Sequence, residues 1–315
     1  MNDIIVLEPV LMEKIWGGSR LKQFGYDTPS DKTGECWGIS GHAHGTNVVA
    51  NGPYKGLTLR QLWEDHRELF ANEEGDEFPL LVKIIDAQDD LSVQVHPDDT
   101  YAKEHENYAF GKTECWYILD KEPSSELVLG HNASTREELQ QMVDDQEWKA
   151  LFRSVPVEKG DFVYVPSGTV HAIGKGIMIL EIQQSSDITY RFYDYGRKDT
   201  NGNERDLHIK DSVACSMVPH VDPVLDRSSW KEDGVAIERL IQEHYFTVHK
   251  WDINGNVVRE NRSYLLMSVI EGTGSVVTEG GTHTLKKGDH FIIPSTVANY
   301  EIIGEMKVIV SETTK

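Results

Sequence analysis

The sequence predicts a mainly β protein of the jelly-roll kind, and the first observation behind this prediction is its strand pattern. Short segments that are β-branched-rich or alternate in polarity recur along the chain, separated by Gly, Asn, Asp and Pro turns. Short strands at regular spacing are typical of a sandwich or barrel. A parallel α/β fold would need a helix after each strand, which this sequence does not provide. The predicted strands are Leu91–His96, Cys115–Leu119, Phe162–Val165, Ile177–Gln183, Ile188–Tyr193, Leu265–Val269 and Val308–Val310.

The second observation is an internal repeat. The segment Lys159–Ser167, KGDFVYVPS, resembles Lys287–Ser295, KGDHFIIPS. In both copies Gly-Asp predicts a turn, a short and mostly apolar strand follows, and Pro ends it. Five residues after the Pro, the first copy carries His171 and the second carries Asn299. We therefore expect one barrel motif to be used twice, with a potential metal ligand only in the first copy.

Helical patterns are few. Thr58 is placed to cap a helix that runs through Phe70. Ser134 or Thr135 is placed to cap another that carries Glu137–Phe152. Because no helix follows each strand in turn, we interpret both as insertions into a β fold.

These patterns suggest a division of the chain. We expect an N-terminal catalytic barrel over residues 1–210, with helical insertions at about 57–73 and 98–152. Residues 211–234 are rich in Ser, Pro and Asp and are the expected linker. Residues 235–315 are expected to form a C-terminal barrel without metal ligands.

Composition describes an ordinary globular protein of 315 residues, with 39% hydrophobic and 26% charged residues. No apolar run approaches the roughly 20 residues that span a bilayer, and the N-terminus lacks a signal-peptide pattern. The cysteines, Cys36, Cys115 and Cys215, are too few and too scattered for a disulfide framework or a thiolate zinc site. A reducing, cytoplasmic location fits best.

The net charge of −21 argues against nucleic acid or an anionic membrane as a partner, since phosphate backbones require basic patches. The same charge constrains any phosphorylated substrate. Its site must be locally positive inside a negative protein. Each Lys or Arg near the predicted chemistry is therefore informative.

The first chemical motif is Leu91–Asp99, LSVQVHPDD. Strand alternation places Ser92, Gln94 and His96 on one face and the aliphatic residues on the other. Two potential ligands two residues apart on one face can bind the same metal. The alternative is a half-exposed strand with a surface histidine.

Two further residues complete a potential ligand set. Glu114 begins an apolar strand, where a carboxylate is usually an exposed edge residue. His171 follows a Pro-Ser-Gly turn between apolar residues, so a satisfied core histidine is the competing explanation. Together with Gln94 and His96 they supply two imidazoles, one carboxylate and one amide, a set that suits a catalytic zinc. One carboxylate leaves Zn²⁺ a formal charge of about +1, so it stays a good Lewis acid.

Basic residues near these motifs meet the requirement for local positive charge. If Ser186–Arg197 begins as a strand, Asp187 and Arg191 share a face. They form either a structural ion pair, or a site in which Arg191 binds phosphate or an oxyanion and Asp187 orients it or moves a proton. Lys83, alone inside an apolar strand, either reaches solvent or faces a polar cavity. With Lys112 it completes the set of candidate cations.

Several of these motifs resemble those of a known family. The chain is similar to type I mannose-6-phosphate isomerases, particularly the short bacterial form. The similarity lies in Gln94–Pro97, Lys112–Glu114, Pro166–His171, Asp187–Arg191 and Phe78–Lys83, and in the N-terminal segments Ile15–Gly18 and Glu35–Gly38. Longer members often have Lys-Pro-Glu where this chain has Lys112-Thr113-Glu114, and the chain has no room for their large helical domain.

The resemblance implies two cupin (jelly-roll) β-barrels with a small helical insertion, and one Zn²⁺ per chain held by Gln94, His96, Glu114 and His171. It implies that Lys83, Lys112, Asp187 and Arg191 are catalytic, and we expect Arg191, Lys112 and Ser92 to bind substrate. The implied reaction interconverts mannose 6-phosphate and fructose 6-phosphate through a cis-enediol, with these sugar phosphates as partners and the oligomeric state left open.

The residues alone leave alternatives. Asp187, a lysine of lowered pKa and zinc-bound hydroxide are all possible general bases. Two histidines and a carboxylate also suit an iron or manganese cupin oxygenase or decarboxylase. A non-catalytic sugar-binding cupin would leave Asp187 and Lys83 without a purpose.

Overall fold

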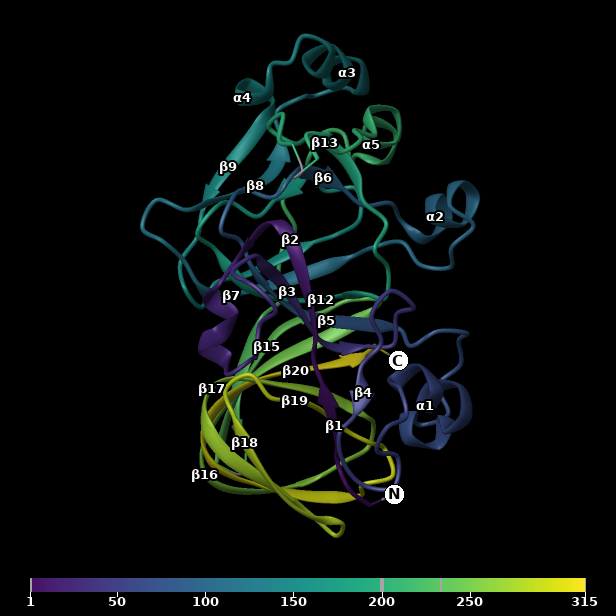
Figure 1. Cartoon of the computed structure of the whole chain (residues 1–315), viewed down its shortest axis with the longest axis vertical. Coiled ribbons are helices and arrows are strands. Elements are labelled where there is room, and N and C mark those ends of the chain that lie inside the picture. Colours follow the sequence, from purple (N-terminus) through teal and green to yellow (C-terminus); the bar gives the residue numbers. More distant parts are fainter. Residues whose placement is uncertain (1, 199–200, 233, 315) are drawn as a thin grey trace.

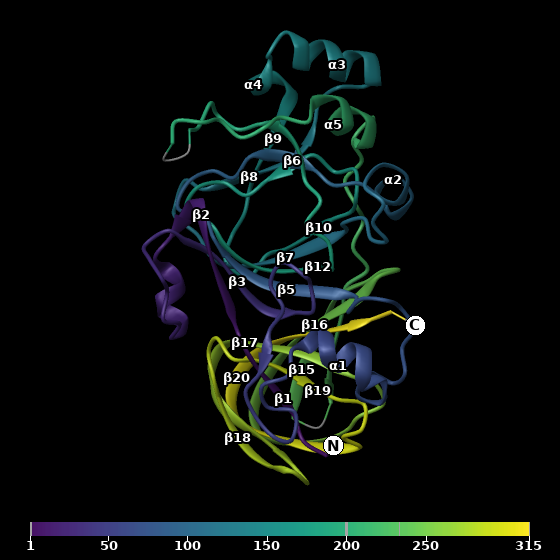
Figure 2. The same ribbon diagram turned by 45° about the vertical axis from the view of Figure 1, so that its right-hand side comes forward.

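The computed structural model describes residues 2–198, 201–232 and 234–314, and strands dominate it (Figure 1). Two facing sheets form the upper region of Figures 1 and 2. The six-stranded sheet has the order β10-β7-β12-β5-β3-β2, and the five-stranded sheet has the order β13-β6-β11-β8-β9. The first contains β2 (Val10–Gly18), β3 (Thr33–Ser40), β5 (Leu80–Asp86), β7 (Glu114–Asp120), β10 (Phe162–Val165) and β12 (Met178–Gln184). The second contains β6 (Val93–Val95), β8 (Glu126–His131), β9 (Phe152–Pro156), β11 (His171–Ala172) and β13 (Tyr190–Tyr193).

A third sheet of nine strands forms the lower region, with the order β14-β15-β16-β20-β17-β19-β1-β4 and β18 paired with β17. It is dominated by three long strands, which share a face of apolar side chains in one core. Its members are β1 (Ile5–Glu8), β4 (Val48–Val49), β14 (Ser228–Glu232), β15 (Val235–Gln242), β16 (Phe246–Glu260), β17 (Leu265–Thr278), β18 (Gly281–Lys286), β19 (His290–Ile293) and β20 (Asn299–Thr313).

The chain is mainly β, as the strand pattern predicts. Over the described residues, each sheet is an open path of strands in its hydrogen-bond order. Closure into two barrels is therefore not confirmed. Two strands from the first 50 residues also belong to the lower sheet, because β1 pairs with β19 and with β4. Hydrophobic periodicity assigns residues to strands but does not say which sheet a strand joins.

The two regions are tied together by a buried polar chain. The Ser268 hydroxyl lies 2.8 Å from His290 Nδ1, and the Tyr26 hydroxyl lies 2.9 Å from His290 Nε2. Tyr26 itself donates to the Gly288 carbonyl at 2.6 Å. Because the Tyr26 hydrogen is used there, the imidazole donates from Nε2 and accepts from Ser268 at Nδ1. β3 packs on this histidine, since a Cβ on Gly38 would meet the ring at 2.4 Å.

The predicted helices form, with different lengths. Thr58 and Gln61 make a capping box at the start of α1 (Leu59–Asp65), and a short 3₁₀ helix, η2 (Arg67–Phe70), follows. Thr135 caps α3 (Arg136–Asp144). The expected continuation to Phe152 is wrong, because Gln146 takes a positive φ of 55° and breaks the helix. The remaining helices are η1 (Arg20–Phe24), α2 (Asp99–His105), α4 (Trp148–Leu151) and α5 (Ile209–Cys215).

The expected linker carries secondary structure of its own. α5 extends into its beginning and β14 lies near its end, while residue 233 lies outside the described residues. β14 pairs with β15 from Ser228 to Glu232, so the linker's last part is the edge of the lower sheet. Ser and Pro content indicated a break in the chain but not this pairing.

The repeat is confirmed at the level of its turns. Gly160 and Gly288 have φ values of 93° and 96°. Asp161 accepts a hydrogen bond from the backbone N–H three residues before it at 2.7 Å, and Asp289 does the same at 2.8 Å. β10 and β19 follow directly. One local sequence therefore makes the same turn and strand in two different sheets.

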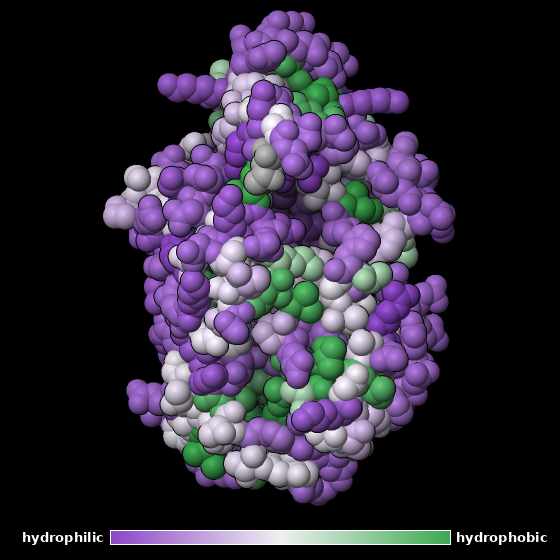
Figure 3. Space-filling view, viewed as in Figure 1, coloured by the Kyte–Doolittle hydropathy of each residue, from purple (hydrophilic) through white to green (hydrophobic). Residues whose placement is uncertain are grey.

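The surface in Figure 3 is mainly hydrophilic, with hydrophobic residues in scattered groups on that face. None of the helices in the described ranges has the length and apolar content that a bilayer crossing requires. Cys36, Cys115 and Cys215 are free thiols, as their scattered positions predict.

Candidate active site

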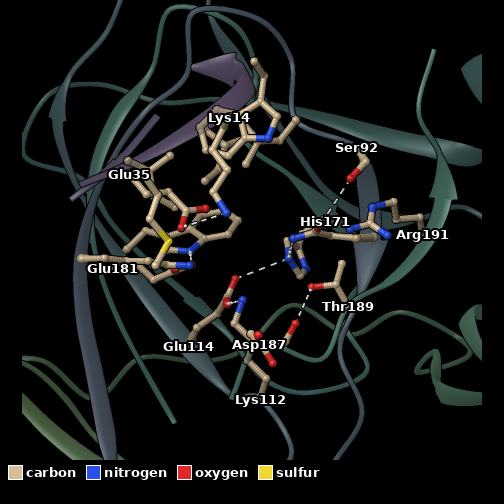
Figure 4. A pocket seen from close by; sticks show the side chains of 18 of the residues that line it. Lys14, Glu35, Ser92, Lys112, Glu114, His171, Glu181, Asp187, Thr189 and Arg191 are labelled. Carbon is tan, nitrogen blue, oxygen red and sulfur yellow. Dashed lines mark hydrogen bonds and ion pairs between the residues drawn. The ribbon is translucent and has the colours of Figure 1, made fainter. Parts of the chain in front are cut away.

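A cavity of about 350 Å³ opens between the two upper sheets, and most of the predicted site residues lie on its walls (Figure 4). The structure brings together residues from distant parts of the sequence because neighbouring strands place them in rows. Of the predicted set, the lining includes Lys83, Ser92, Gln94, Lys112, Glu114, Asp187, Arg191 and His171. His96 is 1% exposed and lies behind this wall, in contact with Lys112 and Glu114.

Two rows of side chains face each other across the cavity. On the six-stranded sheet Glu181 lies opposite both Lys83 and Trp116. On the five-stranded sheet Gln94 lies opposite both His171 and Arg191. Directly opposite residues on neighbouring strands have their Cβ atoms about 5 Å apart, so each row acts as one surface.

His96, Glu114 and His171 form a buried cluster in which each residue offers a ligand atom within 4.8 Å of the others. The two imidazole Nε2 atoms lie 3.6 and 3.4 Å from the Glu114 carboxylate oxygens. All three side chains are 1% exposed. A buried carboxylate between two imidazoles is a typical metal-ligand arrangement.

The surroundings of the two histidines leave the correct ring nitrogen free for a metal. His96 Nδ1 lies 2.7 Å from the Ile188 carbonyl, and His171 Nδ1 lies 2.9 Å from the Thr169 carbonyl. A carbonyl only accepts, so each Nδ1 carries the hydrogen and each Nε2 keeps its lone pair toward Glu114. Burial lowers the pKa of His171 to about 4 and, with help from Lys112, lowers the pKa of His96 well below its usual range. Both rings are therefore neutral at pH 7, as metal ligands must be.

Gln94 and Lys112 complete this end of the cavity. The Gln94 side-chain nitrogen, Nε2, lies 3.5 Å from His96 Nε2 and 3.4 Å from His171 Nε2, and its Oε1 accepts from the Ser92 hydroxyl at 3.3 Å. The Lys112 ammonium lies 2.8 Å from the Glu114 carboxylate and 3.0 Å from His96 Nε2. The carboxylate and the two imidazoles thus fit a divalent ion of the zinc class, and the Gln94 amide would join them only through its oxygen, with the amide group turned over.

Lys83 lies on the opposite wall between carboxylates (Figure 4 shows Glu35 and Glu181 on this side). Its ammonium is 2.7 Å from Glu181, whose other oxygen accepts from Trp116 Nε1 at 2.9 Å. Burial by itself would lower the pKa of Lys83, but Glu181 and Glu35 raise it above its ordinary value. Its two carboxylate neighbours therefore favour the ammonium form, whereas a lysine base would need a lowered pKa.

Arg191 stands across the cavity with Ser92 and Thr189, as Figure 4 shows. Its Nε is buried and makes no hydrogen bond within the described part of the chain. Burial and the neighbouring Arg205 lower the pKa of Arg191, although a guanidinium stays charged. Arg205 is held by two bonds to Asp194, at 2.7 and 2.6 Å. The two arginines give a locally positive wall, as a phosphorylated substrate requires.

Asp187 lies at the cavity mouth and is paired with histidine, not with Arg191, over the ranges that the structure covers. His44 Nδ1 donates to its carboxylate at 2.6 Å, and His42 Nε2 lies 3.8 Å from it. Although partial burial opposes it, the bond from His44 holds the pKa of Asp187 below its usual range. Asp187 is therefore an ionised acceptor facing the cavity and available for proton transfer.

The chain is similar in sequence to proteins of a known family. The family model described as "Phosphomannose isomerase type I, catalytic domain" matches residues 4–129, and "Mannose-6-phosphate isomerase, cupin domain" matches residues 236–313. Mannose-6-phosphate isomerase ManA of Bacillus subtilis is 49% identical over 98% of both chains. The mannose-6-phosphate isomerase of Streptococcus mutans is 47% identical over 100% of both. The chain belongs to the type I phosphomannose isomerases.

A solved structure supports this membership. The crystal structure of a mannose 6-phosphate isomerase from Bacillus subtilis superposes with a TM-score of 0.96 at 50% identity, covering 98% of this chain and 99% of that chain. An Archaeoglobus fulgidus structure at 21% identity, with a TM-score of 0.77, shows the shared fold alone. Membership makes this chain an enzyme, and it sets aside the oxygenase and the non-catalytic cupin as explanations of the site.

For this phosphomannose isomerase, inspection of the sequence missed several residues of the cavity wall. Glu181 and Arg205 are the most informative. Glu181 forms an ion pair with Lys83, and Arg205 is a charged neighbour of Arg191. The isolated acid in the apolar run MILEIQQ was an available signal, parallel to Lys83 in its own strand. Arg205 follows the strand in an irregular segment and carried no periodic signal. The other missed lining residues include Lys14, Glu35, Trp37 and His44.

His42, His44 and Asp187 form a second group with metal-ligand spacing. The hydrogen bonds argue against a metal there. The backbone N–H of His44 donates to His42 Nδ1 at 3.2 Å, so a neutral His42 carries its hydrogen on Nε2, the atom that faces Asp187. This phosphomannose isomerase therefore has one group with both the spacing and the tautomers for a metal among its described residues.

Proposed function

We propose that the chain is a zinc-dependent aldose–ketose isomerase of the cytoplasm, which interconverts mannose 6-phosphate and fructose 6-phosphate through a cis-enediol. The observation that carries this proposal is the buried His96–Glu114–His171 cluster, with both Nε2 lone pairs directed at one carboxylate. The cluster shares a cavity with the Arg191 guanidinium, whose Nε has no hydrogen-bond partner among the described residues. We take the substrates from the names of the related proteins, which are called mannose-6-phosphate isomerases.

Gln94, His96, Glu114 and His171 would hold the metal. When bound, Zn²⁺ would supply Lewis acidity toward the carbonyl and hydroxyl oxygens at C1 and C2. The chain's part is to keep both imidazoles neutral and oriented through the Ile188 and Thr169 carbonyls. The single carboxylate limits the negative charge around the ion, which preserves that acidity.

Arg191 binds the phosphate or the charge of the enediolate, with Ser92 as a hydroxyl donor on the same wall. An arginine can meet a phosphate with two parallel hydrogen bonds, and the Arg191 guanidinium lines the cavity. Arg205 adds positive charge beside it. In a chain of net charge −21, this pair supplies the local field that an anionic substrate needs.

We place the reacting end of the sugar, C1 and C2, between Lys83 and Lys112. Both are ammonium groups held by carboxylates, at 2.7 Å from Glu181 and 2.8 Å from Glu114. We assign to them hydrogen bonding to the oxygens on which negative charge develops. Asp187 moves a proton at a sugar hydroxyl from the cavity mouth, oriented by His44.

We also propose two cupin units in this chain. Residues 1–210 form the catalytic unit, 211–234 connect, and 235–315 form a cupin-like unit without metal ligands. The cupin family match over residues 236–313 and the equivalent Gly-Asp turns support this division. Because β1 pairs with β19, the first strand would belong to the sheet of the second unit, although it lies within the sequence range of the first.

The experiment is a coupled assay of fructose 6-phosphate formation from mannose 6-phosphate, before and after chelation and with Zn²⁺ added back. We expect chelation to abolish turnover and Zn²⁺ to restore it. Arg191→Ala should raise KM and lower kcat/KM by about 100-fold. Arg153→Ala is the matched control, because Arg153 pairs with Asp222 at the surface. Absence of turnover by zinc-loaded protein overturns the proposal.

A further inference from the structure

A second cavity, of about 230 Å³, lies on the lower sheet and shares no lining residue with the active-site cavity. Its wall follows the strand register from the β14 edge inward. Trp230 lies opposite Ile237, and Ile237 lies opposite Trp251. The row therefore presents an indole on each side of one aliphatic residue. Because β14 ends the sheet, Trp230 has no further strand beyond it and is 41% exposed.

Two hydrogen-bond donors in this wall have no partner. Trp251 Nε1 and Arg259 Nη1 are buried and make no hydrogen bond to any described residue. Trp251 is 5% exposed, and the Arg259 guanidinium lies 4.6 Å from its ring centroid. The Glu232 carboxylate accepts from Arg259 Nη2 at 3.3 Å. A rigid, buried donor without an acceptor is unfavourable unless a ligand or water supplies one.

The charges around the cavity are balanced. Arg259 and Arg262 line it together with Glu260 and Glu312. His249 adds no charge, since burial, with Arg239 and Arg259, lowers its pKa to about 4. An anion would gain little in such a site, because each guanidinium has a carboxylate beside it. A ligand rich in hydroxyl groups can instead accept from the donors and donate to the carboxylates.

We propose that this cavity binds a neutral pyranose sugar. The apolar face of the ring packs on Trp230 at the sheet edge, as an exposed and rigid aromatic surface favours. Sugar hydroxyls accept from Trp251 Nε1 and Arg259 Nη1 and donate to the Glu260 carboxylate. The site is separate from the isomerase chemistry, and it gives the C-terminal region that contains the cupin-family match a function of its own.

The test uses glycosides, whose rings cannot open and which are therefore not isomerase substrates. Binding of methyl α-D-mannopyranoside, methyl α-D-glucopyranoside and methyl α-D-galactopyranoside to the full, metal-loaded chain is measured by calorimetry and by tryptophan fluorescence. We expect saturable binding of at least one of them. Trp230→Ala should weaken that binding by at least about tenfold while leaving isomerase turnover unchanged.

Two further variants keep the result interpretable. Trp230→Phe retains an aromatic face and should retain most of the binding. Glu260→Gln should weaken it without disturbing the strand, because Glu260 is exposed at the end of β16. The proposal is overturned if none of the three glycosides binds saturably. It is equally overturned if binding survives Trp230→Ala and Glu260→Gln but is lost in Arg191→Ala, because the sugar then occupies the active site.

Discussion

The two copies of the repeat, Lys159–Ser167 and Lys287–Ser295, lead the chain to different places. After the proline of the first copy the chain enters the active-site cavity. After the proline of the second copy it reaches the surface. His171 begins β11 and is 1% exposed. Asn299, at the same distance from its proline, begins β20 and is exposed. The turns themselves match closely, so the difference does not come from the motif.

What differs is the sheet that receives the following strand. β11 has two residues and lies between β6 and β8, which places His171 beside Gln94. β20 has 15 residues and runs between β16 and β17, where its register is set by a long apolar face. A shared motif can thus place a ligand-type residue in a buried cluster in one copy and only support a strand in the other.

The largest expected effect comes from removing the ligand-type residue in each copy. His171→Ala should lose bound metal and lower turnover by at least about 100-fold, since it removes one imidazole from the cluster. Asn299→Ala, the matched change, should alter neither. Metal analysis and the coupled assay measure both. Full metal content in His171→Ala would show that this histidine is not a ligand.

The sequence and the structure agree best where chemistry follows from alternation. Gln94 and His96 share a strand face, and Glu114 and His171 meet them although they lie up to 77 residues apart. Spacing predicts which side of a strand a residue faces, and the resemblance indicated which strands meet.

The parts that could not be predicted depend on packing between strands. The Lys83–Glu181 contact follows from the pairing of β5 with β12, which no local pattern contains. The membership of β1 in the lower sheet has the same cause. The early end of α3 rests on the left-handed backbone of Gln146, a residue type that seldom marks a helix end.

A buried ion pair in the upper region can be compared with the partly exposed ion pairs of Glu271, which lies on β17 of the lower region. Glu181→Gln leaves the Lys83 ammonium buried without its closest counter-charge, and should lower the free energy of unfolding by about 3 kcal/mol. Glu271→Gln, which loses contacts to Lys159 and Lys307 near the surface, should cost less than about 1 kcal/mol. Urea unfolding measures both. Equal costs would mean that Lys83 is hydrated in solution.

The first residue of the strand after each turn differs between the two copies, and this difference should change how stability depends on pH. Phe162 fills this position in the first copy and His290 fills it in the second. Burial lowers the pKa of His290 to about 4. The unfolded chain, with an ordinary pKa of about 6.5, binds the proton first, so stability is lost as pH falls from about 6.5 to about 4, by up to about 1.4 kcal/mol per unit.

His290→Phe makes the second copy like the first and should reduce the slope of this part of the profile, to which His171 and His249, also with a pKa of about 4, still contribute. It should also lower stability at pH 8 by about 1 to 3 kcal/mol, because Ser268 and Tyr26 lose their partner. Thermal unfolding between pH 8 and pH 4 gives both values. An unchanged slope would show that another group causes the acid sensitivity.

The smallest effect tests whether the two turns are equivalent in energy as well as in shape. Asp161→Ala and Asp289→Ala each remove one hydrogen bond to the backbone N–H that lies three residues earlier. Each should lower the free energy of unfolding by about 1 kcal/mol, the usual net value of such a bond. Chemical denaturation of both variants, with the double variant to test additivity, measures the costs. Because the bonds differ by only 0.1 Å, costs that differ by more than about 1 kcal/mol would mean that the surrounding sheets, and not the motif, hold the turns in place.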